Sequence, residues 1–257
     1  MTTTRLSQHI QRLYRLPGAP GEPADTALPL VGPDGRVRAM VLALGHPGDW
    51  AALSAVWRGV QADLALPAPA IAVNGVDAFE LWFSLAEPVP LAQADAFLQG
   101  LCQRYLVDTP PRRVRRMPSM EEGAATHSTP LIPAPQGATG NWSAFVAPDL
   151  AAVFGDDPVL DLPPGADAQA ELLGRLSPIK LAAFENALAQ LQPAAPSTAT
   201  APQASAAPAA PVEPWQGVTN TYEDPRRFLL DVMNDASVSL ALRIEAAKVL
   251  LETGGGA

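Results

Sequence analysis

Cysteine, lysine and long apolar runs are scarce in this chain, and each shortage limits what the protein can be. The one cysteine, Cys102, cannot form a disulfide within the chain, which is typical of a reducing compartment. No segment is apolar enough to span a bilayer, and the first residues lack the apolar core of a signal peptide. We therefore expect a cytoplasmic protein that does not associate with membranes.

Positive charge is also in short supply. The 257 residues include 26 acidic and 17 basic side chains, for a formal net charge of −9, and only two of the basic residues are lysines. This balance argues against a protein that coats nucleic acid by bulk charge. Any anion-binding site must therefore be a local patch. The candidate is the segment from Arg112 to Arg116, "RRVRR", which holds four arginines in five residues.

The short motifs that identify common active sites are missing. His9, His46 and His127 are scattered without metal-ligand spacing, and the chain has no Gly-rich phosphate loop, CxxC pair or GxSxG elbow. The turn "GHPGD", which contains His46 and Asp49, is expected to cap the helix that follows it.

Hydrophobic residues make up 48% of the chain, which predicts that most of it folds. Between residues 36 and 117 the apolar periodicity predicts the order β-α-β-β-α-β, an α+β fold of the ferredoxin or RRM-like type. Helices at 48–64 and 90–106 should cover one face of a four-stranded antiparallel sheet and leave the other face open. A hairpin is expected between 27–31 and 36–44, around the turn "GPDG".

The domain organisation follows from composition. Residues 1–192 should form an α+β body, with extra helices at 5–16 and 166–191, the latter broken near Pro178. Residues 193–214 contain little but Ala, Pro, Ser, Thr and Gln and predict a flexible linker. Residues 215–257 then form a small helical module. Its helical hairpin, residues 222–252, is a candidate binding element for a protein partner.

Side-chain alternation predicts which residues face the open side of the sheet. In "AFELWFSL", Phe79, Leu81 and Phe83 should pack under the helices, so Glu80 and Trp82 point to the open face. In "RRVRRM", Val114 is the apolar choice for the helix side. Arg113 and Arg115 should then lie on the open face, near Glu80 and Trp82.

Arginines beside an exposed tryptophan suit phosphates and bases. Guanidinium groups form bidentate bonds to phosphate oxygens, and an indole can stack on a base. An equally weighted alternative is that the arginines pair with nearby acids and protect an edge strand. The predicted phosphate- or nucleic-acid-binding residues are Arg112, Arg113, Arg115, Arg116 and Trp82.

Three segments resemble, in order, the motifs of the archaeo-eukaryotic primase family. They are "MVLALGHPGDW", "NGVDAFELWF" and "LVDTPPRRVRRMPS", within residues 36–120. The resemblance implies an RRM-like catalytic half that acts on nucleic acid or nucleotides with divalent metal ions held by carboxylates. A second, shorter resemblance lies in "FLLDVMND" and "LRIEAAKVLLE", which are similar to a helical motif of phage terminase small-subunit-like proteins.

The chain departs from the primase pattern at its metal ligands. The first motif should supply two carboxylates at alternate positions, but the strand ends in Leu44 and Gly45 and the nearest acid is Asp49. Glu80 stands where a histidine is expected. The resemblance therefore implies a degenerate member; an active one would use Asp49, Glu80 and Asp108 to hold the metal.

Three hypotheses follow. The first is a nucleic-acid- or nucleotide-associated protein of a replication or mobile-element context, with weak or lost catalysis. The second is a non-enzymatic adaptor that acts through its C-terminal hairpin. The third is an active metal-dependent nucleotidyltransferase that uses Asp49, Glu80 and Asp108.

Overall fold

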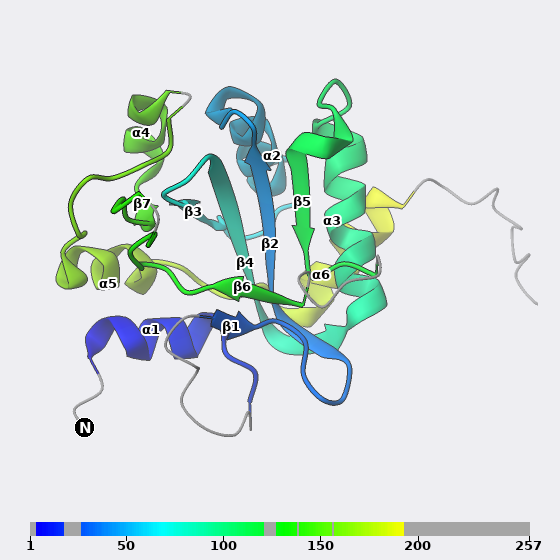
Figure 1. Cartoon of the computed structure of the whole chain (residues 1–257). Coiled ribbons are helices and arrows are strands. Elements are labelled where there is room, and N and C mark those ends of the chain that lie inside the picture. The colour runs from blue at the N-terminus through cyan, green and yellow to red at the C-terminus, as the bar shows by residue number, and fades with distance from the viewer. Residues whose placement is uncertain (1–3, 18–26, 121–126, 138, 156, 193–257) are drawn as a thin grey trace, which may run out of the picture. The chain divides into compact units, whose positions relative to one another are not determined.

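The computed structural model describes residues 4–17, 27–120, 127–137, 139–155 and 157–192. Its fold is α+β, as predicted, with helices on both sides of an antiparallel sheet (Figure 1). The predicted linker at 193–214 and the predicted helical module at 215–257, including the hairpin 222–252, lie outside the described residues and stay predictions.

The main sheet has five strands in the order β5-β2-β4-β3-β7, and every neighbouring pair is antiparallel. The order β-α-β-β-α-β predicted for residues 36–117 is confirmed, and β2 lies between β4 and β5 in the sheet. A further strand, β7, pairs with β3 and makes the sheet five-stranded. The strands are β2 (Arg36–Gly45), β3 (Ala70–Val73), β4 (Ala78–Pro90), β5 (Val114–Met117) and β7 (Ala144–Val146).

A second, two-stranded sheet corrects the predicted hairpin. Strand β1 (Ala27–Pro29) pairs with β6 (Ser128–Pro130), a strand that the sequence did not predict. A single bridge from Val31 to Val37 is what remains of the expected pairing with β2. The two chain segments that flank the core therefore meet each other.

The helices begin where the sequence predicted them. Helix α1 starts after Thr4, whose side chain accepts a hydrogen bond from the backbone N–H of Ser7, and α2 starts after Asp49 in the same way, with Ala52 as donor. None of the helices in the described ranges is long and apolar enough to cross a membrane. The helices are α1 (Arg5–Tyr14), α2 (Trp50–Ala62), α3 (Leu91–Tyr105), α4 (Pro148–Ala151), α5 (Ala166–Gly174) and α6 (Leu181–Leu191), with short 3-10 turns η1 (Pro111–Arg113) and η3 (Ala152–Phe154).

The first face of the sheet packs on α2, α3 and α6 (Figure 1). Phe79, Leu81 and Phe83 of β4 are buried there with Leu42 and Leu44 of β2. The predicted register of β4 is therefore confirmed. Burial of these apolar side chains against the helices is the main stabilising contribution on this side.

The second face is covered too, and the prediction of an open face was wrong. A second buried cluster joins α1, β1, α5 and this side of the sheet, with Tyr14, Leu28, Phe145 and Leu173 among its members. Segments before and after the core supply this layer (Figure 1). The sheet is thus buried on both faces, and a ligand can reach the second face only where the covering layer leaves a gap.

Candidate functional site

Trp82 is not available to stack on a base. It points to the second face, as predicted, but it is 2% exposed and packs edge-on against Tyr14 and Phe145, with ring centroids 5.2 Å and 5.7 Å away. Its indole Nε1–H donates a hydrogen bond of 2.8 Å to Glu80 Oε2. The side chain is therefore a core residue and the partner of a buried carboxyl group.

The four clustered arginines do not share one face of the sheet. Arg115 lies on the second face of β5, whereas Arg116 lies on the helix side, with its Nε 3.9 Å from Asp95 Oδ1. Arg113 belongs to η1, not to the strand, and turns toward the loop after β2. Arg112 is exposed in the same turn. The expectation that Arg113 and Arg115 share one sheet face was wrong, because the chain has not yet entered the strand at Arg113.

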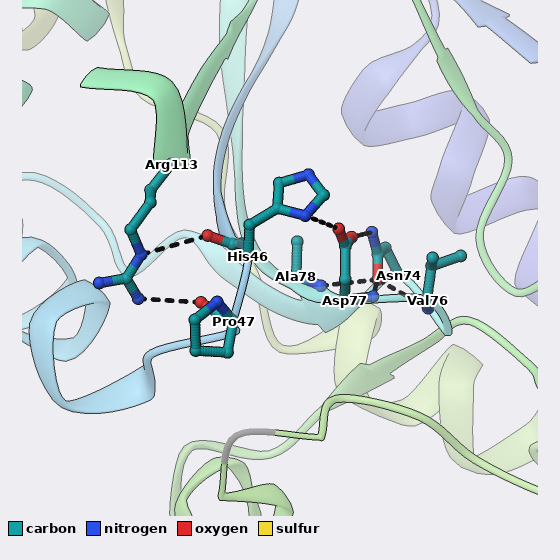
Figure 2. Close-up of polar contacts among 8 residues, drawn as sticks. His46, Pro47, Asn74, Val76, Asp77, Ala78 and Arg113 are labelled. Carbon is teal, nitrogen blue, oxygen red and sulfur yellow. Dashed lines mark hydrogen bonds and ion pairs between the residues drawn. The ribbon is translucent and has the colours of Figure 1, made fainter. Parts of the chain in front are cut away.

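Arg113 holds the loop that follows β2. Its Nε donates to Gly45 O at 3.3 Å and its Nη2 to Pro47 O at 2.9 Å, so the guanidinium bonds the carbonyls on both sides of His46 (Figure 2). Asp49 Oδ2 lies 3.5 Å from the same group. His46 has a φ of 58°, a left-handed conformation uncommon for a non-glycine residue. The clamp from Arg113 offsets the strain of this backbone.

His46 is oriented by the turn between β3 and β4. Its Nδ1 lies 2.8 Å from Asp77 Oδ2, and Asp77 Oδ1 accepts a hydrogen bond of 3.0 Å from Asn74 Nδ2 (Figure 2). Asn74 Oδ1 in turn accepts from the backbone N–H groups of Val76, Asp77 and Ala78. This Asx-type turn fixes the carboxylate, and the carboxylate fixes the imidazole, which remains largely exposed.

Glu80 and Arg115 lie two strands apart in one row across the sheet. The register pairs Ala43 of β2 with Glu80 on one side and with Arg115 on the other. On the far side of Glu80, the partner in β3 is Ala72. The two alanines carry only methyl groups, so the row leaves room above the sheet beside the Glu80 carboxyl group. Strands lie about 4.8 Å apart, which places Arg115 within reach of this space.

Burial controls the ionisation of Glu80. The residue is 4% exposed, and desolvation raises the pKa of its carboxyl group above the ordinary value. The Trp82 N–H and the charge of Arg115 lower this pKa, and the charge of Asp77 raises it, but the desolvation effect is the largest. Glu80 is therefore biased toward the neutral form, in which it can donate as well as accept a hydrogen bond.

A cavity of about 280 Å³ opens over this row. We call it the Glu80 cavity. It joins the His46–Asp77 pair, the Glu80–Arg115 row and residues that follow β6. Its lining residues are His46, Asn74, Val76, Asp77, Glu80, Arg115, Met117, Pro130, Ile132, Gln136 and Ser143.

The three acids that an active enzyme was expected to use do not assemble. Asp49 caps α2 and faces Arg113, Glu80 is buried in the sheet, and Asp108 is exposed in the turn after α3. Within the described ranges, no three His, Cys, Asp or Glu side chains form a group that could hold a metal ion.

Sequence reasoning missed the pairing of His46 with Asp77. A signal was available, because β2 and β4 pair so that Gly45 lies opposite Ala78. The next residue after β2 and the residue just before β4 must then be neighbours.

No family model and no curated protein matches the chain. A solved structure that matches is the AEP domain of the primase-polymerase of cyanophage S-2L, at 15% sequence identity and a TM-score of 0.30. The match covers 54% of this chain and 61% of that one, so the chain spans about three fifths of the length of that domain. This chain is similar to a phage primase-polymerase domain at a level that shows neither its fold nor its activity.

Proposed function

We propose that the chain is a nucleotide- or nucleic-acid-associated protein that holds a phosphate-bearing ligand in the Glu80 cavity. The observation that carries the proposal is the placement of Arg115. Its side chain lines the cavity, and within the described part of the chain no acidic group lies at ion-pair distance from it. A guanidinium group with free donors is suited to bidentate contacts with phosphate oxygens.

The other residues that line the Glu80 cavity are suited to the base of a nucleotide. Met117 and Ile132 offer apolar surface to a flat ring, while Gln136 and the Glu80 carboxyl group offer hydrogen-bond donors and acceptors. The Glu80 carboxyl group can accept a hydrogen bond from an N–H of a base, and in its neutral form it can also donate one to a ring nitrogen. The proposed ligand is therefore a single nucleotide or the end of a strand, in keeping with a replication or mobile-element context.

The positions of the carboxylates favour ligand binding with weak or lost catalysis over nucleotidyl transfer. Two-metal transfer needs carboxylates that share the metal ions. Asp49 is engaged at a helix start and by Arg113, and Asp108 lies in a different turn. We therefore do not propose metal-dependent transfer by Asp49, Glu80 and Asp108.

The test compares two neighbouring arginines. Binding of a fluorescein-labelled 12-nucleotide single-stranded DNA and its RNA equivalent is measured by anisotropy, with ATP and AMP as competitors, at several salt concentrations. Arg115→Ala should weaken binding by about tenfold or more, since charge-assisted hydrogen bonds contribute about 1.5–3 kcal/mol. Arg112→Ala, an exposed arginine outside the cavity, is the control and should change affinity less than about twofold.

Affinity should fall as salt rises, because salt screens the attraction between the Arg115 guanidinium group and the phosphate. Equal losses of affinity in Arg112→Ala and Arg115→Ala would show that the probe binds a diffuse basic surface and not the Glu80 cavity. The absence of binding to every probe at low salt would overturn the proposed function.

A further inference from the structure

A second hollow lies on the side of β5 that faces α3. β5 ends the five-stranded order, so β2 is its single strand neighbour in the described structure. Between β5 and the C-terminal half of α3 a groove of about 780 Å³ remains, closed at one end by the turn that joins them. We call it the α3–β5 groove. It is well over twice the volume of the Glu80 cavity.

The groove combines apolar surface with positive charge. Leu106 and Val114 line it, and Val107, which also lines it, is 74% exposed. Arg115 and Arg116 also line it. None of the lining residues that the structure describes is Asp or Glu, although acids outnumber bases in the chain by 26 to 17. Arg116 pairs with Asp95 of α3 at 3.9 Å, and the charged side chains among the described lining residues are both basic.

The groove lacks what single-stranded nucleic acid needs. Proteins that bind single strands stack bases on aromatic side chains, and none of the described lining residues is aromatic. Aliphatic side chains beside guanidinium groups instead complement a peptide with aliphatic and carboxylate side chains. The amides of Gln99 and Gln103 lie along α3 in the groove and can bond a peptide backbone.

We propose that the α3–β5 groove binds an acidic segment of a partner protein that also carries aliphatic side chains. The proposal is independent of the proposed function, because the ligand there occupies the Glu80 cavity on the opposite face of β5. Arg115 lines both spaces. The groove is therefore tested through Cys102 and Gln103, which line only the groove.

The chain carries its own reporter for this site. Cys102 is the one cysteine of the sequence and lines the groove. Burial raises the pKa of its thiol to about 11, so its reaction with a thiol reagent is slow near neutral pH and is best followed near pH 9. A ligand seated in the groove must slow this reaction, whereas a ligand elsewhere leaves it unchanged.

The experiment starts from a displayed library of random 12-residue peptides selected on the full-length chain. Enriched peptides should combine acidic and aliphatic residues. One enriched peptide, made synthetically, should bind with an affinity that falls with salt and should slow iodoacetamide modification of Cys102 at least fivefold at saturation. No enrichment, enrichment of basic peptides, or binding without protection of Cys102 would overturn the proposal.

Matched charge variants of α3 locate the contact. Gln103→Glu places one carboxylate in the groove and should weaken the peptide at least tenfold. Ala92→Glu adds a carboxylate to an exposed position near the start of the same helix and should leave the affinity within about twofold. Equal effects of the two changes would show a response to net charge rather than to the groove.

Two other occupants are tested with the same thiol reaction. A 12-nucleotide single strand that protects Cys102 as well as the peptide does would make the groove a nucleic-acid site. A modification rate that falls as protein concentration rises, with a matching dimer in light scattering, would make the occupant a second copy of the chain. Either result overturns the peptide proposal. Because Arg115 lines both spaces, protection of Cys102 by the single strand would also assign the effect of Arg115→Ala to the groove.

Discussion

The side-chain amide of Gln169 bonds both main-chain polar groups of Phe145. Gln169 Oε1 accepts from Phe145 N at 2.8 Å, and Gln169 Nε2 donates to Phe145 O at 2.9 Å. Phe145 lies in β7, which ends the sheet opposite to β5 and has β3 as its single strand neighbour in the described structure. The amide from α5 therefore takes the place that a further strand would fill, and it closes this edge of the sheet.

Removing the Gln169 amide should be costly. Gln169→Ala leaves the buried N–H and C=O of Phe145 without partners, and we expect a loss of about 2–4 kcal/mol in the free energy of unfolding. Gln169→Glu keeps an acceptor but loses the donor, and it too should destabilise. Urea unfolding checks both, with the exposed Gln103→Ala as control. A loss below about 0.5 kcal/mol for Gln169→Ala would mean that water replaces the amide.

Arg113 and Arg112 should differ in their effect on stability. Arg113→Ala removes two hydrogen bonds to the loop around His46, and we expect a loss of about 1–2 kcal/mol after allowing for its partial exposure. Arg112→Ala should change stability by less than about 0.5 kcal/mol. Thermal unfolding gives the comparison, and NMR shifts of the loop report its release. Equal stability of the two variants would contradict the clamp.

Glu80→Gln should stabilise the protein more at high pH than at low pH. Burial raises the pKa of Glu80 in the folded state, so its ionisation costs more there than in the unfolded chain. The contribution of the Glu80 carboxyl group to the free energy of unfolding is therefore fully present below the pKa that it has in the unfolded chain. This contribution is lost as the pH rises through the higher pKa of the folded state. The advantage of the variant in urea unfolding should grow between pH 4 and pH 8. A constant difference would show that Glu80 titrates as it does in the unfolded chain.

Trp82→Phe separates a core role from a ligand-binding role. The change removes the N–H that bonds Glu80 Oε2, and we expect a loss of about 1–3 kcal/mol in unfolding free energy. Because Trp82 is enclosed by Tyr14 and Phe145, oligonucleotide affinity should stay within about twofold. Loss of affinity at unchanged stability would place Trp82 in contact with ligand.

The core of the fold could be predicted because its elements are long and periodic. The apolar set Phe79, Leu81 and Phe83 alternates with other residues over a full strand, and the two flanking helices each carry a continuous apolar stripe. Local patterns of this length leave little choice of register.

The covered second face could not be predicted from local patterns, since it depends on short segments far apart in the sequence. Strands β1 and β6 have three residues each and are separated in the sequence by the whole core, residues 36–117. A sign was nevertheless present in β2, where every residue from Ala39 to Leu44 is apolar and buried. An uninterrupted apolar strand is typical of a sheet covered on both sides.

The candidate site was predicted in part. The row that joins Glu80 to Arg115 follows from alternation and strand order, and the structure contains it. The expected partner Arg113 fell outside the strand, because Pro110 and Pro111 extend the preceding turn to Arg113. A shift of one residue in the start of β5 therefore decides whether Arg113 lies on the sheet face.

The burial of β4 on both faces has a consequence for the substitutions that this protein tolerates. Eight consecutive residues, from Ala78 to Leu85, are buried, so the strand has no solvent-facing half. A deep mutational scan should therefore show no alternation of permissive and restrictive positions along it. Instead we expect a continuous block of intolerance, in which a new charge is rejected at each position that lacks a hydrogen-bond donor such as the Trp82 N–H beside Glu80.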